Sequence, residues 1–545
     1  MPTLICVPIM VENPHEALDD AMLARAKSAE LVEYRVDSLF KGDIDSTSAV
    51  DLLVAESPLP CIITCRPAWE GGQYEGSEEA RLALFERLVS LDHPPRYIDI
   101  ELSAIERTPG FLDRVVAART NRQGGQNSGP TLLISVHDFA QRPADLYKTM
   151  SKLRSSDTGR VHKLAWRARS LRDNLELFEL LRERDRPTIA LGMGEFGLMS
   201  RVLAPKFNAF LTFASLRDDS ATAPGQPTLE ELLNLYRFRS INAKTRVFGV
   251  IGWPVAQSRS PHIHNAAFEA IEENAVYLPL PVIEGWESFK ATLGALLDDP
   301  HLDFAGCSVT IPHKEHLLRF AQEDRSRDWA IDPIAQRIGA ANTLVVRTRK
   351  SGGRGECSVH NTDAEGILAP LRARLDTLEG VRIGIIGAGG AARAAAVSLA
   401  DAGATILIHN RSRDRAESLA AHINALLGPH EGSASVAHQG DLASCRVLIN
   451  ATPVGMAGGA GGDEDGAMAI DAATLDSLGK DAIVFDTVYN PAETALLRGA
   501  GERGLTTIGG REMFIAQAAL QFRLWTGRGA PVSLMSRILD ETTGG

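Results

Sequence analysis

Cysteine is scarce in this chain of 545 residues, and its six cysteines are scattered without a CxxC pair or an accompanying histidine cluster. This argues against a zinc site and a disulfide framework, so we expect reduced thiols in the core and no metal centre. No apolar run reaches membrane-spanning length. The strand-like run LICVPIM begins at residue 4 and leaves no room for a signal or transit peptide after Met1, so we expect a cytoplasmic protein.

The chain also lacks a charged tail, since its net charge of -12 is spread along the sequence. It therefore has no nucleic-acid footprint. Hydrophobic residues make up 44% and charged residues 23%, which argues against a disordered or fibrous protein. Because single cores stop growing at about 250 to 300 residues, the chain should form two to four soluble domains.

Short apolar runs recur through the first 215 residues. They are LICVPI, LVEYRV, LPCIITC, RYIDIEL, TLLISV, VHKLAW, PTIALG and FLTFA. Helix-compatible amphipathic segments, such as 16–30 and 78–91, lie between them, and the strands start at intervals of roughly 20 to 40 residues. This rhythm predicts a (β/α)8 barrel in the first half of the chain.

Lys163 lies inside one of these runs, VHKLAW. A lone lysine on a buried strand usually buries its stem and extends its head to solvent. In a barrel, however, side chains at the carboxyl ends of the strands gather around one pocket. The polar residues at those ends are Glu33, Arg35, Arg66, Glu70, Asp99, Glu101, His137, Asp138, Lys163, Arg201 and the TAPGQ loop at 222–226.

Each of these residues alone has a structural explanation, because Glu33 and Arg35 could form an ion pair and His137 could be a core histidine. Together they indicate imine chemistry. Desolvation and neighbouring cations would favour the free amine of Lys163, which attacks a ketone while a histidine moves protons. Three arginines at 35, 66 and 201 suit a carboxylate, so the predicted substrate is a keto acid.

Residues 1–240 resemble the type I 3-dehydroquinate dehydratases through EYRVD, TCRPAWEGG, YIDIEL, SVHDF, HKLAWRA, GMGEFGLMSR and TAPGQ. The resemblance implies that Lys163 forms a Schiff base with the C3 ketone, that His137 shuttles protons and that Glu70 holds His137 by a hydrogen bond. It further implies that Arg201 and Gln226 grip the substrate carboxylate and hydroxyls, and that Glu33, Arg35 and Arg66 complete the polar wall. Many members have serine where this chain has Thr222, which keeps the hydroxyl and adds a methyl group.

The pattern changes near residues 240–245, where we place the domain boundary. Residues 381–416 read as strand, glycine turn, helix and second strand, the setting of a dinucleotide fingerprint. Gly387 and Gly389, with Gly390 and Ala391 opening the helix, would let the backbone approach a pyrophosphate at the helix N-terminus. The alternative is a simple tight turn with close helix packing.

The end of the second strand indicates the cofactor. NAD enzymes usually carry an acidic residue there, but this chain has His409, Asn410 and Arg411, followed by Arg413 and Arg415. Basic residues favour a 2'-phosphate, so NADP(H) is the predicted cofactor, although Arg413 could be an exposed surface residue. By position, NATPVGM at 450–456 would lie under the riboses, and FDTVYNP at 485–491 follows another strand.

Candidate substrate groups precede this fingerprint. Ser258 and Ser260 lie before a predicted helix at Pro261, where they could receive a carboxylate or act as ordinary N-cap serines. Thr310 and Lys314 follow an apolar strand, and Asp363 precedes a helix. A lysine and aspartate pair facing nicotinamide suits hydride chemistry, with a surface salt bridge as the alternative.

Residues 246–545 resemble shikimate dehydrogenase through GVIGWPVAQSRSPHIHNAAF, CSVTIPHK, GAANTLV, NTDAEG, GAGGAARA, NRSRDRA, NATPVGM, DTVYNP and FIAQAALQF, with Gln257 in place of the common histidine. The resemblance implies a substrate domain at 246–365, completed by helices at about 513–545, and an NADP-binding Rossmann domain at 366–512. Implied roles are carboxylate binding by Ser258 and Ser260; hydroxyl contacts from Thr310, Asn342 and Gln517; catalysis by Lys314 and Asp363; Tyr489 near substrate and nicotinamide; and cofactor contacts from Gly387, Ala388, Gly389, Gly390, Ala391, Asn410, Arg411, Arg415, Thr452 and Gly510.

Together the two resemblances imply a bifunctional enzyme of the shikimate pathway that dehydrates 3-dehydroquinate and then reduces 3-dehydroshikimate to shikimate with NADPH. Its partners would be these small molecules, with a homodimer possible and neither nucleic acid nor membrane involved. Alternatives within enzymes are a quinate dehydrogenase in the second half and a class I aldolase-like imine reaction in the first. An alternative of another class is a metabolite sensor that has lost catalysis.

Overall fold

The computed structural model describes residues 2–41, 46–120, 129–155, 161–218, 225–347, 355–427, 433–456 and 467–542. Thr222, predicted to contact substrate, lies outside the described residues. The chain divides into two units, Met1–Thr245 and Arg246–Gly545.

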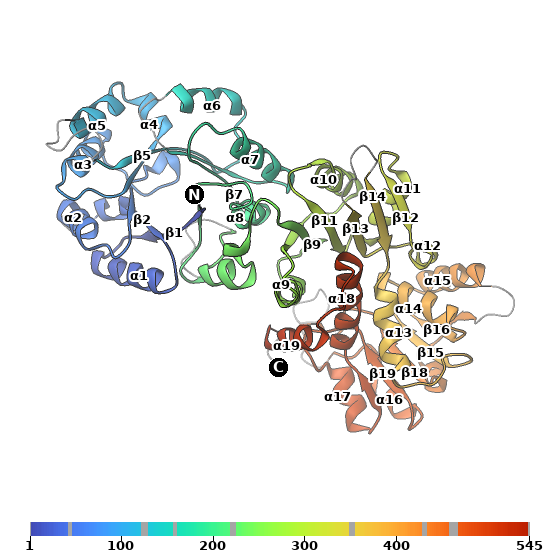
Figure 1. The fold of residues 1–545 in the computed structure, drawn as a ribbon. Coiled ribbons are helices and arrows are strands. Elements are labelled where there is room, and N and C mark those ends of the chain that lie inside the picture. The colour runs from blue at the N-terminus through green and yellow to red at the C-terminus, as the bar shows by residue number, and fades with distance from the viewer. Residues whose placement is uncertain are drawn as a thin grey trace. The chain divides into compact units, whose positions relative to one another are not determined.

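The first unit is an eight-stranded parallel sheet in the order β7-β6-β5-β4-β3-β2-β1-β8, ringed by helices (Figure 1). Its strands are β1 (Leu4–Met10), β2 (Leu31–Arg35), β3 (Cys61–Thr64), β4 (Tyr97–Glu101), β5 (Thr131–Asp138), β6 (Val161–Arg167), β7 (Thr188–Met193) and β8 (Leu211–Phe213). The two ends of the sheet meet through a hydrogen bond of 2.8 Å from Phe210 N to Thr188 O. The predicted α/β barrel is confirmed, with all eight apolar runs as its strands.

The barrel helices follow the expected alternation with the strands. They are α1 (Pro14–Ala26), α2 (Ser46–Glu56), α3 (Glu78–Ser90), α4 (Leu102–Arg107), α5 (Phe111–Thr120), α6 (Leu146–Ser155), α7 (Arg172–Arg182) and α8 (Leu198–Val202). Local sequence fixes their starts: the Asn13 side chain accepts from His15 N, and the Ser77 side chain accepts from Ala80 N. Such caps satisfy amide donors that have no partner within the helix.

Strand alternation decides which way Lys163 points. Val161 and Ala165 of β6 belong to the apolar cluster that fills the barrel, together with Leu133 and Leu191. Because side chains alternate along a strand, Lys163 lies on this inner face between Val161 and Ala165. The lysine is therefore directed into the barrel.

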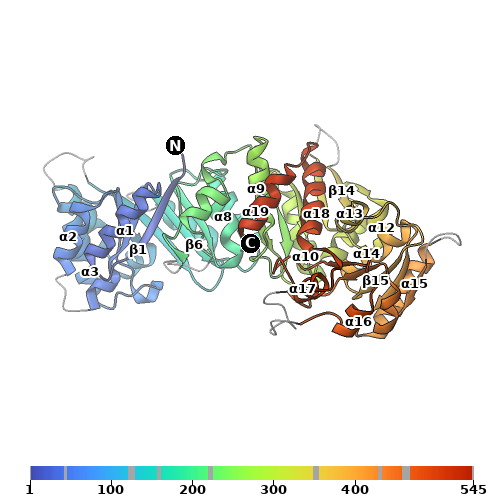
Figure 2. The same cartoon turned by 90° about the horizontal axis from the view of Figure 1, so that it is seen from below.

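The second unit begins with a mixed six-stranded sheet in the order β10-β9-β11-β13-β14-β12. Its strands are β9 (Arg246–Gly252), β10 (Ala275–Pro281), β11 (Phe304–Val309), β12 (Asp328–Ile331), β13 (Thr343–Arg347) and β14 (Glu356–His360). Its helices are α9 (Ser260–Ala270), α10 (Trp286–Asp298), α11 (Lys314–Glu323), α12 (Pro333–Ile338), α13 (Asp363–Arg372), α18 (Gly510–Thr526) and α19 (Val532–Thr542). The last two return from the end of the chain and lie beside α9 and α13 (Figure 2), where Phe522 and Trp525 pack with Phe248 and Phe268.

A second sheet of this unit is all parallel, in the order β17-β16-β15-β18-β19-β20. Its strands are β15 (Arg382–Ile386), β16 (Thr405–His409), β17 (Ala434–Val436), β18 (Val447–Asn450), β19 (Ile483–Asp486) and β20 (Thr506–Ile508), and its helices are α14 (Gly390–Asp401), α15 (Arg413–Leu426), α16 (Ala472–Ser477) and α17 (Ala495–Glu502). This is the strand order of a dinucleotide-binding fold, whose ligand crevice opens between β15 and β18. The predicted Rossmann-type sheet is confirmed.

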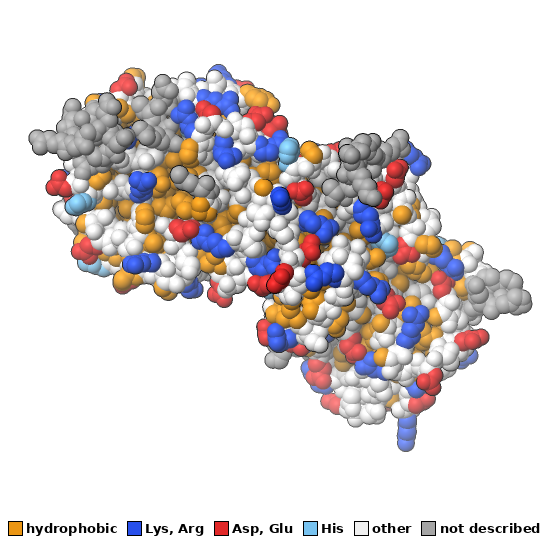
Figure 3. Space-filling view, in the orientation of Figure 1, with side chains coloured by type: hydrophobic (Ala, Val, Ile, Leu, Met, Phe, Trp, Pro, Cys, Tyr) orange, Lys and Arg blue, Asp and Glu red, His pale blue; other side chains and the backbone are white. Residues whose placement is uncertain are grey.

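Two general expectations from composition can be compared with the structure. All six cysteines are unpaired and buried, as predicted. Acidic and basic side chains are interspersed on the face shown in Figure 3, in keeping with a net charge spread along the chain. Among the described residues, no helix is long and apolar enough to cross a membrane.

Candidate active sites

A pocket of about 570 Å³ opens at the carboxyl ends of the barrel strands. It is lined by Glu33, Arg35, Arg66, Glu70, Gly71, His137, Phe139, Lys163, Ala165, Leu191, Met193, Arg201, Phe213 and Gln226. The described barrel residues to which the resemblance gives a role all line this one pocket, whereas Asp99, Glu101 and Asp138, which the strand ends also placed there, are not among its lining residues. The lining adds the apolar side chains, which sequence reasoning had not assigned to the site.

Lys163 is buried and ion-paired at the base of this pocket. Its Nζ donates to Asp99 Oδ2 at 2.9 Å and to Glu33 Oε1 at 3.2 Å, and it lies 4.8 Å from the centre of the Phe213 ring. Two carboxylates and an aromatic face therefore surround the Lys163 amine. That desolvation and neighbouring cations favour the free amine stays a prediction.

Arg66 connects this pair to His137. Its NH2 donates to Asp99 Oδ2 at 3.0 Å, and its NH1 lies 2.9 Å from His137 Nδ1. Because a guanidinium only donates, Nδ1 is the acceptor, and a neutral His137 carries its proton on Nε2. Burial, followed by the charges of Arg66 and Lys163, lowers the pKa of His137 well below its usual value. His137 is thus held neutral and able to take up a proton.

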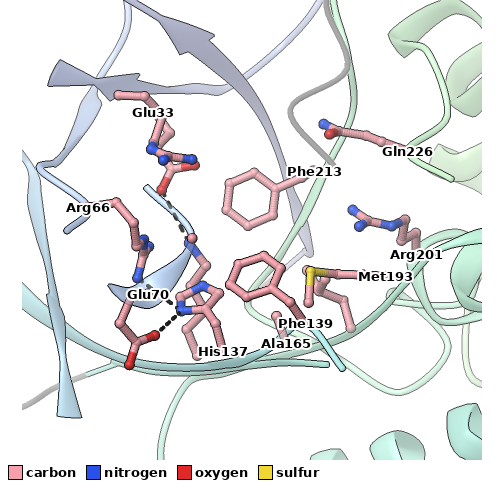
Figure 4. A pocket seen from close by; sticks show the side chains of 14 residues that line it. Glu33, Arg66, Glu70, His137, Phe139, Ala165, Met193, Arg201, Phe213 and Gln226 are labelled. Atoms are coloured by element: carbon pink, nitrogen blue, oxygen red, sulfur yellow. Dashed lines mark hydrogen bonds and ion pairs between the residues drawn. The ribbon is translucent and has the colours of Figure 1, made fainter. Parts of the chain in front are cut away.

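Glu70 does not form the predicted hydrogen bond. Its Oε2 lies 3.6 Å from His137 Nδ1, beyond hydrogen-bond length, while its Oε1 accepts from Ser103. Figure 4 shows both contacts on the His137 ring, and the hydrogen bond to Nδ1 is the one from Arg66. Burial raises the pKa of Glu70. The structure places Glu70 beside His137, but as a close electrostatic neighbour.

The opposite wall of the pocket holds Arg201 and Gln226 (Figure 4). Arg201 is 1% exposed, and its Nε has no hydrogen-bond partner among the described residues. Burial lowers the pKa of this guanidinium to about 10. A buried guanidinium without an anion is costly, so this wall is complementary to a carboxylate. The rings of Phe139 and Phe213 lie between the two walls.

The other two predicted arginines are already engaged. Arg35 donates to both oxygens of Asp37, at 2.9 and 3.0 Å. Arg66 contacts Asp99, Glu101 and Ser135 in addition to His137. Neither arginine needs a substrate anion to balance its charge. Of the three arginines predicted to suit a carboxylate, Arg201 is therefore the one whose charge is not already paired with a described residue.

Asp99 is the residue of this site to which sequence reasoning gave no role. It is fully buried and accepts from Lys163, Arg66 and Ser135. Its position at the end of a strand placed it among the polar residues of the barrel mouth. Its role as the common acceptor for two cations could not be read from the sequence, because it depends on side chains of three separate strands.

In the second unit, Lys314 and Asp363 meet as predicted. Lys314 Nζ donates to Asp363 Oδ2 at 2.5 Å. Each is the first residue of a helix, α11 and α13 respectively, that follows a strand of the mixed sheet. Asp363 is buried, whereas the Lys314 side chain is 21% exposed. The pair is therefore not a surface salt bridge, because only the ammonium side is accessible.

The predicted hydroxyl-binding residues are organised around Asn342. Its Nδ2 donates to Gln517 Oε1 at 3.2 Å, and its Oδ1 accepts from Thr362 N at 2.8 Å, next to Asp363. Ser258 Oγ accepts from the Ser260 amide at 3.3 Å, at the start of α9. Thr310 packs against Gly252, where a Cβ atom would lie 2.4 Å from its methyl group.

The glycine turn after β15 fits a dinucleotide. Gly387 has φ +117°, and a Cβ atom there would lie 3.0 Å from Ala451 O and 3.1 Å from Thr452 Cγ2. Gly389, the residue before α14, has open space where its side chain would be. A Cβ on Gly390 would come 4.0 Å from Lys314 Cδ. The helix N-terminus is therefore open to a pyrophosphate and lies close to the Lys314 side chain.

Basic residues follow β16, as the sequence indicated. Arg411 and Arg415 are exposed, and Asn410 Nδ2 donates to Ser412 O. Arg413 pairs with Glu417 at 2.8 Å, which agrees with its reading as a surface residue. Tyr489 stacks on Phe514 at 4.7 Å, and burial raises its pKa. Arg411 and Arg415 remain available for a 2'-phosphate.

The fold and the two sites define a class: a barrel with a buried lysine in its mouth, joined to a Rossmann-type oxidoreductase with a lysine and aspartate pair. Family models match the chain as "Type I 3-dehydroquinase" over residues 5–243, "Shikimate dehydrogenase substrate binding domain" over 250–344, "Shikimate / quinate 5-dehydrogenase" over 370–443 and "Shikimate 5'-dehydrogenase C-terminal domain" over 510–539.

Two curated relatives agree with these models. The chloroplastic bifunctional 3-dehydroquinate dehydratase/shikimate dehydrogenase of Arabidopsis thaliana is 35% identical over 99% of this chain and 85% of its own length. The shikimate dehydrogenase (NADP(+)) of Methanocella arvoryzae is 38% identical over 53% of this chain and 97% of its own length. The solved dehydroquinate dehydratase and shikimate dehydrogenase of S. pombe is 24% identical over 99% and 98% of the two chains, with a TM-score of 0.43. The chain belongs to the bifunctional 3-dehydroquinate dehydratase/shikimate dehydrogenase family.

Proposed function

We propose that the barrel dehydrates 3-dehydroquinate to 3-dehydroshikimate through a Schiff base on Lys163, and that the second unit reduces this product to shikimate with NADPH. The observation that carries the proposal is that one pocket holds a buried lysine and, on its opposite wall, a buried arginine whose Nε has no hydrogen-bond partner among the described residues. A substrate with a ketone and a carboxylate would engage both. The Lys314 and Asp363 pair beside the glycine turn supports the second step.

In the dehydratase step, Lys163 loses a proton and attacks the ketone, and water leaves as the imine forms. His137, which burial keeps neutral, is the base that accepts the proton from Lys163. The imine withdraws electrons from the neighbouring C2, so loss of the C2 proton gives an enamine that expels the C1 hydroxyl as water. A second water then hydrolyses the imine and restores Lys163. Arg201 holds the carboxylate throughout, and Asp99 and Glu33 accept hydrogen bonds from the restored amine.

In the dehydrogenase step, NADPH when bound supplies the hydride. Lys314 donates a proton to the carbonyl oxygen as it becomes a hydroxyl, and Asp363 holds the ammonium in place. Ser258 and Ser260 receive the carboxylate, while Thr310, Asn342 and Gln517 orient the ring hydroxyls. The end of β16 carries His409, Asn410 and Arg411 where NAD enzymes usually have an acidic residue. Arg411 and Arg415 are therefore suited to hold the 2'-phosphate.

Borohydride trapping tests the imine directly. Borohydride added with 3-dehydroquinate should reduce the imine and leave a covalent adduct on Lys163, located by peptide mass spectrometry. An unmodified Lys163 under turnover conditions would contradict the proposal. An aldolase-like reaction would instead trap substrates of another class and leave 3-dehydroquinate unmodified.

A coupled assay tests both steps together. The whole chain, given 3-dehydroquinate and NADPH, should oxidise NADPH and form shikimate. No turnover with intact cofactor binding would identify a sensor, and equal rates with quinate or NAD would contradict the assigned specificity. The cytoplasmic location, the homodimer and the limits of the three domains stay predictions.

A further inference from the structure

Asp486 is a buried carboxylate at the edge of the parallel sheet where the cofactor crevice opens. It is the last residue of β19 and is paired in register with Asn450, the last residue of β18. It is fully buried. Sequence analysis included it in the FDTVYNP motif without a role, and the proposed reaction does not use it.

Three donors from different segments meet on this carboxylate. Asp486 Oδ1 accepts from Asn450 Nδ2 at 2.9 Å and from Val488 N at 3.1 Å, and its Oδ2 accepts from Thr494 Oγ1 at 2.6 Å. Thr494 is the N-cap of α17. One side chain thus connects the end of β18, the loop after β19 and the start of a helix.

Asn450 extends this connection into the NATPVGM loop. Its Oδ1 accepts from Thr452 N at 3.0 Å and from Thr452 Oγ1 at 2.7 Å, and its Nδ2 also donates to Val454 O at 3.2 Å. Thr452 in turn packs against the Gly387 turn, where a Cβ atom would lie 3.1 Å from its methyl group. The path from Asp486 therefore reaches the glycine turn through two intervening residues.

A second path leads from Asp486 to the other side of the crevice. Val488, whose amide donates a hydrogen bond to Asp486, is the residue immediately before Tyr489. The start of α18 packs closely against the same backbone segment, since a Cβ atom on Gly510 would lie 2.3 Å from Val488 O. Thr452, Tyr489 and Gly510 were all predicted from the sequence to lie at the cofactor or substrate, and Asp486 contacts the segments that carry them.

We propose that Asp486 is a positioning residue that holds the Thr452 and Tyr489 loops in the geometry that binds NADP(H), acting through Asn450 and the Val488 amide. This rests on the proposed function for the identity of the cofactor. A carboxylate suits the task because it accepts several bonds at once and has no proton to donate. Burial raises the pKa of Asp486 to about 6, so at pH 8 the group is ionised and all three donors face an acceptor.

The test compares variants of the full chain at pH 8 by the dissociation constant of NADP+, measured by fluorescence titration. Asp486→Ala should weaken binding about 10- to 100-fold, the effect of losing one or two buried hydrogen bonds. Asn450→Ala should weaken it in the same range, and the double variant should be no weaker than Asp486→Ala, because both act on one path. Asp486→Asn should restore most of the affinity, since the amide oxygen still accepts and its NH2 can donate to the Thr494 hydroxyl.

Asp471→Ala is the matched control. Asp471 also accepts two bonds, from Thr474 N and Oγ1, as the N-cap of α16, but it contacts neither loop through these bonds. It should lower the melting temperature without changing NADP+ affinity, and the dehydratase activity of each variant reports on the integrity of the barrel. Wild-type affinity in Asp486→Ala or, should that variant fail to fold, in Asn450→Ala would overturn the inference. So would an equal loss in Asp471→Ala. If the wild-type chain bound no NADP+, the proposed function would fail together with the inference.

Discussion

The two sites are built from different kinds of contact. The barrel site gathers ionisable groups from the inner faces of strands and from the connection after β3, and Lys163, Asp99, Arg66 and His137 form one charged network. The dehydrogenase site uses glycines, amides and hydroxyls at the ends of strands, with Lys314 and Asp363 as its proposed catalytic pair. In the proposed reactions the protein's own side chains carry the imine chemistry, whereas a cofactor carries the hydride.

The two sites also differ in which structural elements hold their side chains in position. Lys163, Asp99 and His137 lie on strands and are fixed by the sheet itself, and of the four groups of the network only Arg66 comes from a connection, the one after β3. The dehydrogenase groups lie at the first residues of helices or in loops, and they depend on ties such as Asp486 and Asn342. Substitutions should therefore affect one activity at a time, and the second activity of the same chain serves as the control.

The largest effect is expected for Lys163→Ala. Without the amine no imine forms, so the dehydratase rate should fall at least about 10⁴-fold. Shikimate oxidation with NADP+ should stay within about twofold of wild type if the two sites act independently. Steady-state assays of both reactions on one preparation check this. A parallel loss of both activities would contradict the separation of the sites.

Lys314→Ala makes the reciprocal test. Removing the proton donor should reduce shikimate-dependent NADP+ reduction about 10²- to 10⁴-fold, the usual contribution of a general acid or base. The dehydratase rate should not change. Asp363→Asn keeps the shape of the partner but not its charge and should fall between wild type and Lys314→Ala. An unchanged kcat in Lys314→Ala would show that the pair is only a salt bridge.

Arg201→Met sharpens the comparison within the barrel. It removes a buried charge that has no partner among the described residues, so thermal stability should be kept or raised. The KM for 3-dehydroquinate should nevertheless rise about 100-fold, because the carboxylate loses its guanidinium. Arg35→Met is the matched control, since Arg35 is already paired with Asp37, and its effect on KM should be smaller. Equal effects in the two variants would contradict the assignment of Arg201.

In the barrel site, the sequence predicted the direction of side chains along a strand better than the pairing between side chains. The period of two residues along VHKLAW places Lys163 on the inner face with Val161 and Ala165, and the structure agrees. Pairing between side chains was harder to predict. The bond from Arg66 to His137 in place of one from Glu70 depends on distances of 2.9 and 3.6 Å across separate strands. No local pattern in the sequence encodes that choice.

The contacts of the Lys163 amine could not be predicted for a related reason. The sequence places basic residues near Lys163 and also shows Glu33 and Asp99, but it does not show which group reaches the amine. In the fold, the carboxylates make the contact, and Arg66 is turned toward Asp99 and His137. In the second unit, Lys314 and Asp363 were predictable because each begins a helix that follows a strand after a short connection, where the chain has little freedom.

A last prediction concerns stability in the second unit. His264 is fully buried beside Tyr277 and Trp525, and burial lowers its pKa to about 3. In the unfolded chain its pKa is about 6.5, so below that pH the unfolded state binds a proton that the folded state refuses. Stability is therefore complete above pH 6.5 and falls as the pH drops, by about 2 kcal/mol from this residue between pH 7 and 5.

His264→Phe keeps a ring in this cluster and removes the titration. Urea unfolding followed by circular dichroism should show a smaller loss of stability between pH 7 and 5 in this variant than in wild type, with the difference attributable to His264. His301→Gln, at an exposed position of the same unit, should leave the pH dependence unchanged. If His264→Phe lost as much stability as wild type, the acid sensitivity of this unit would have to come from another group. A candidate within this unit is His313, whose pKa burial also lowers.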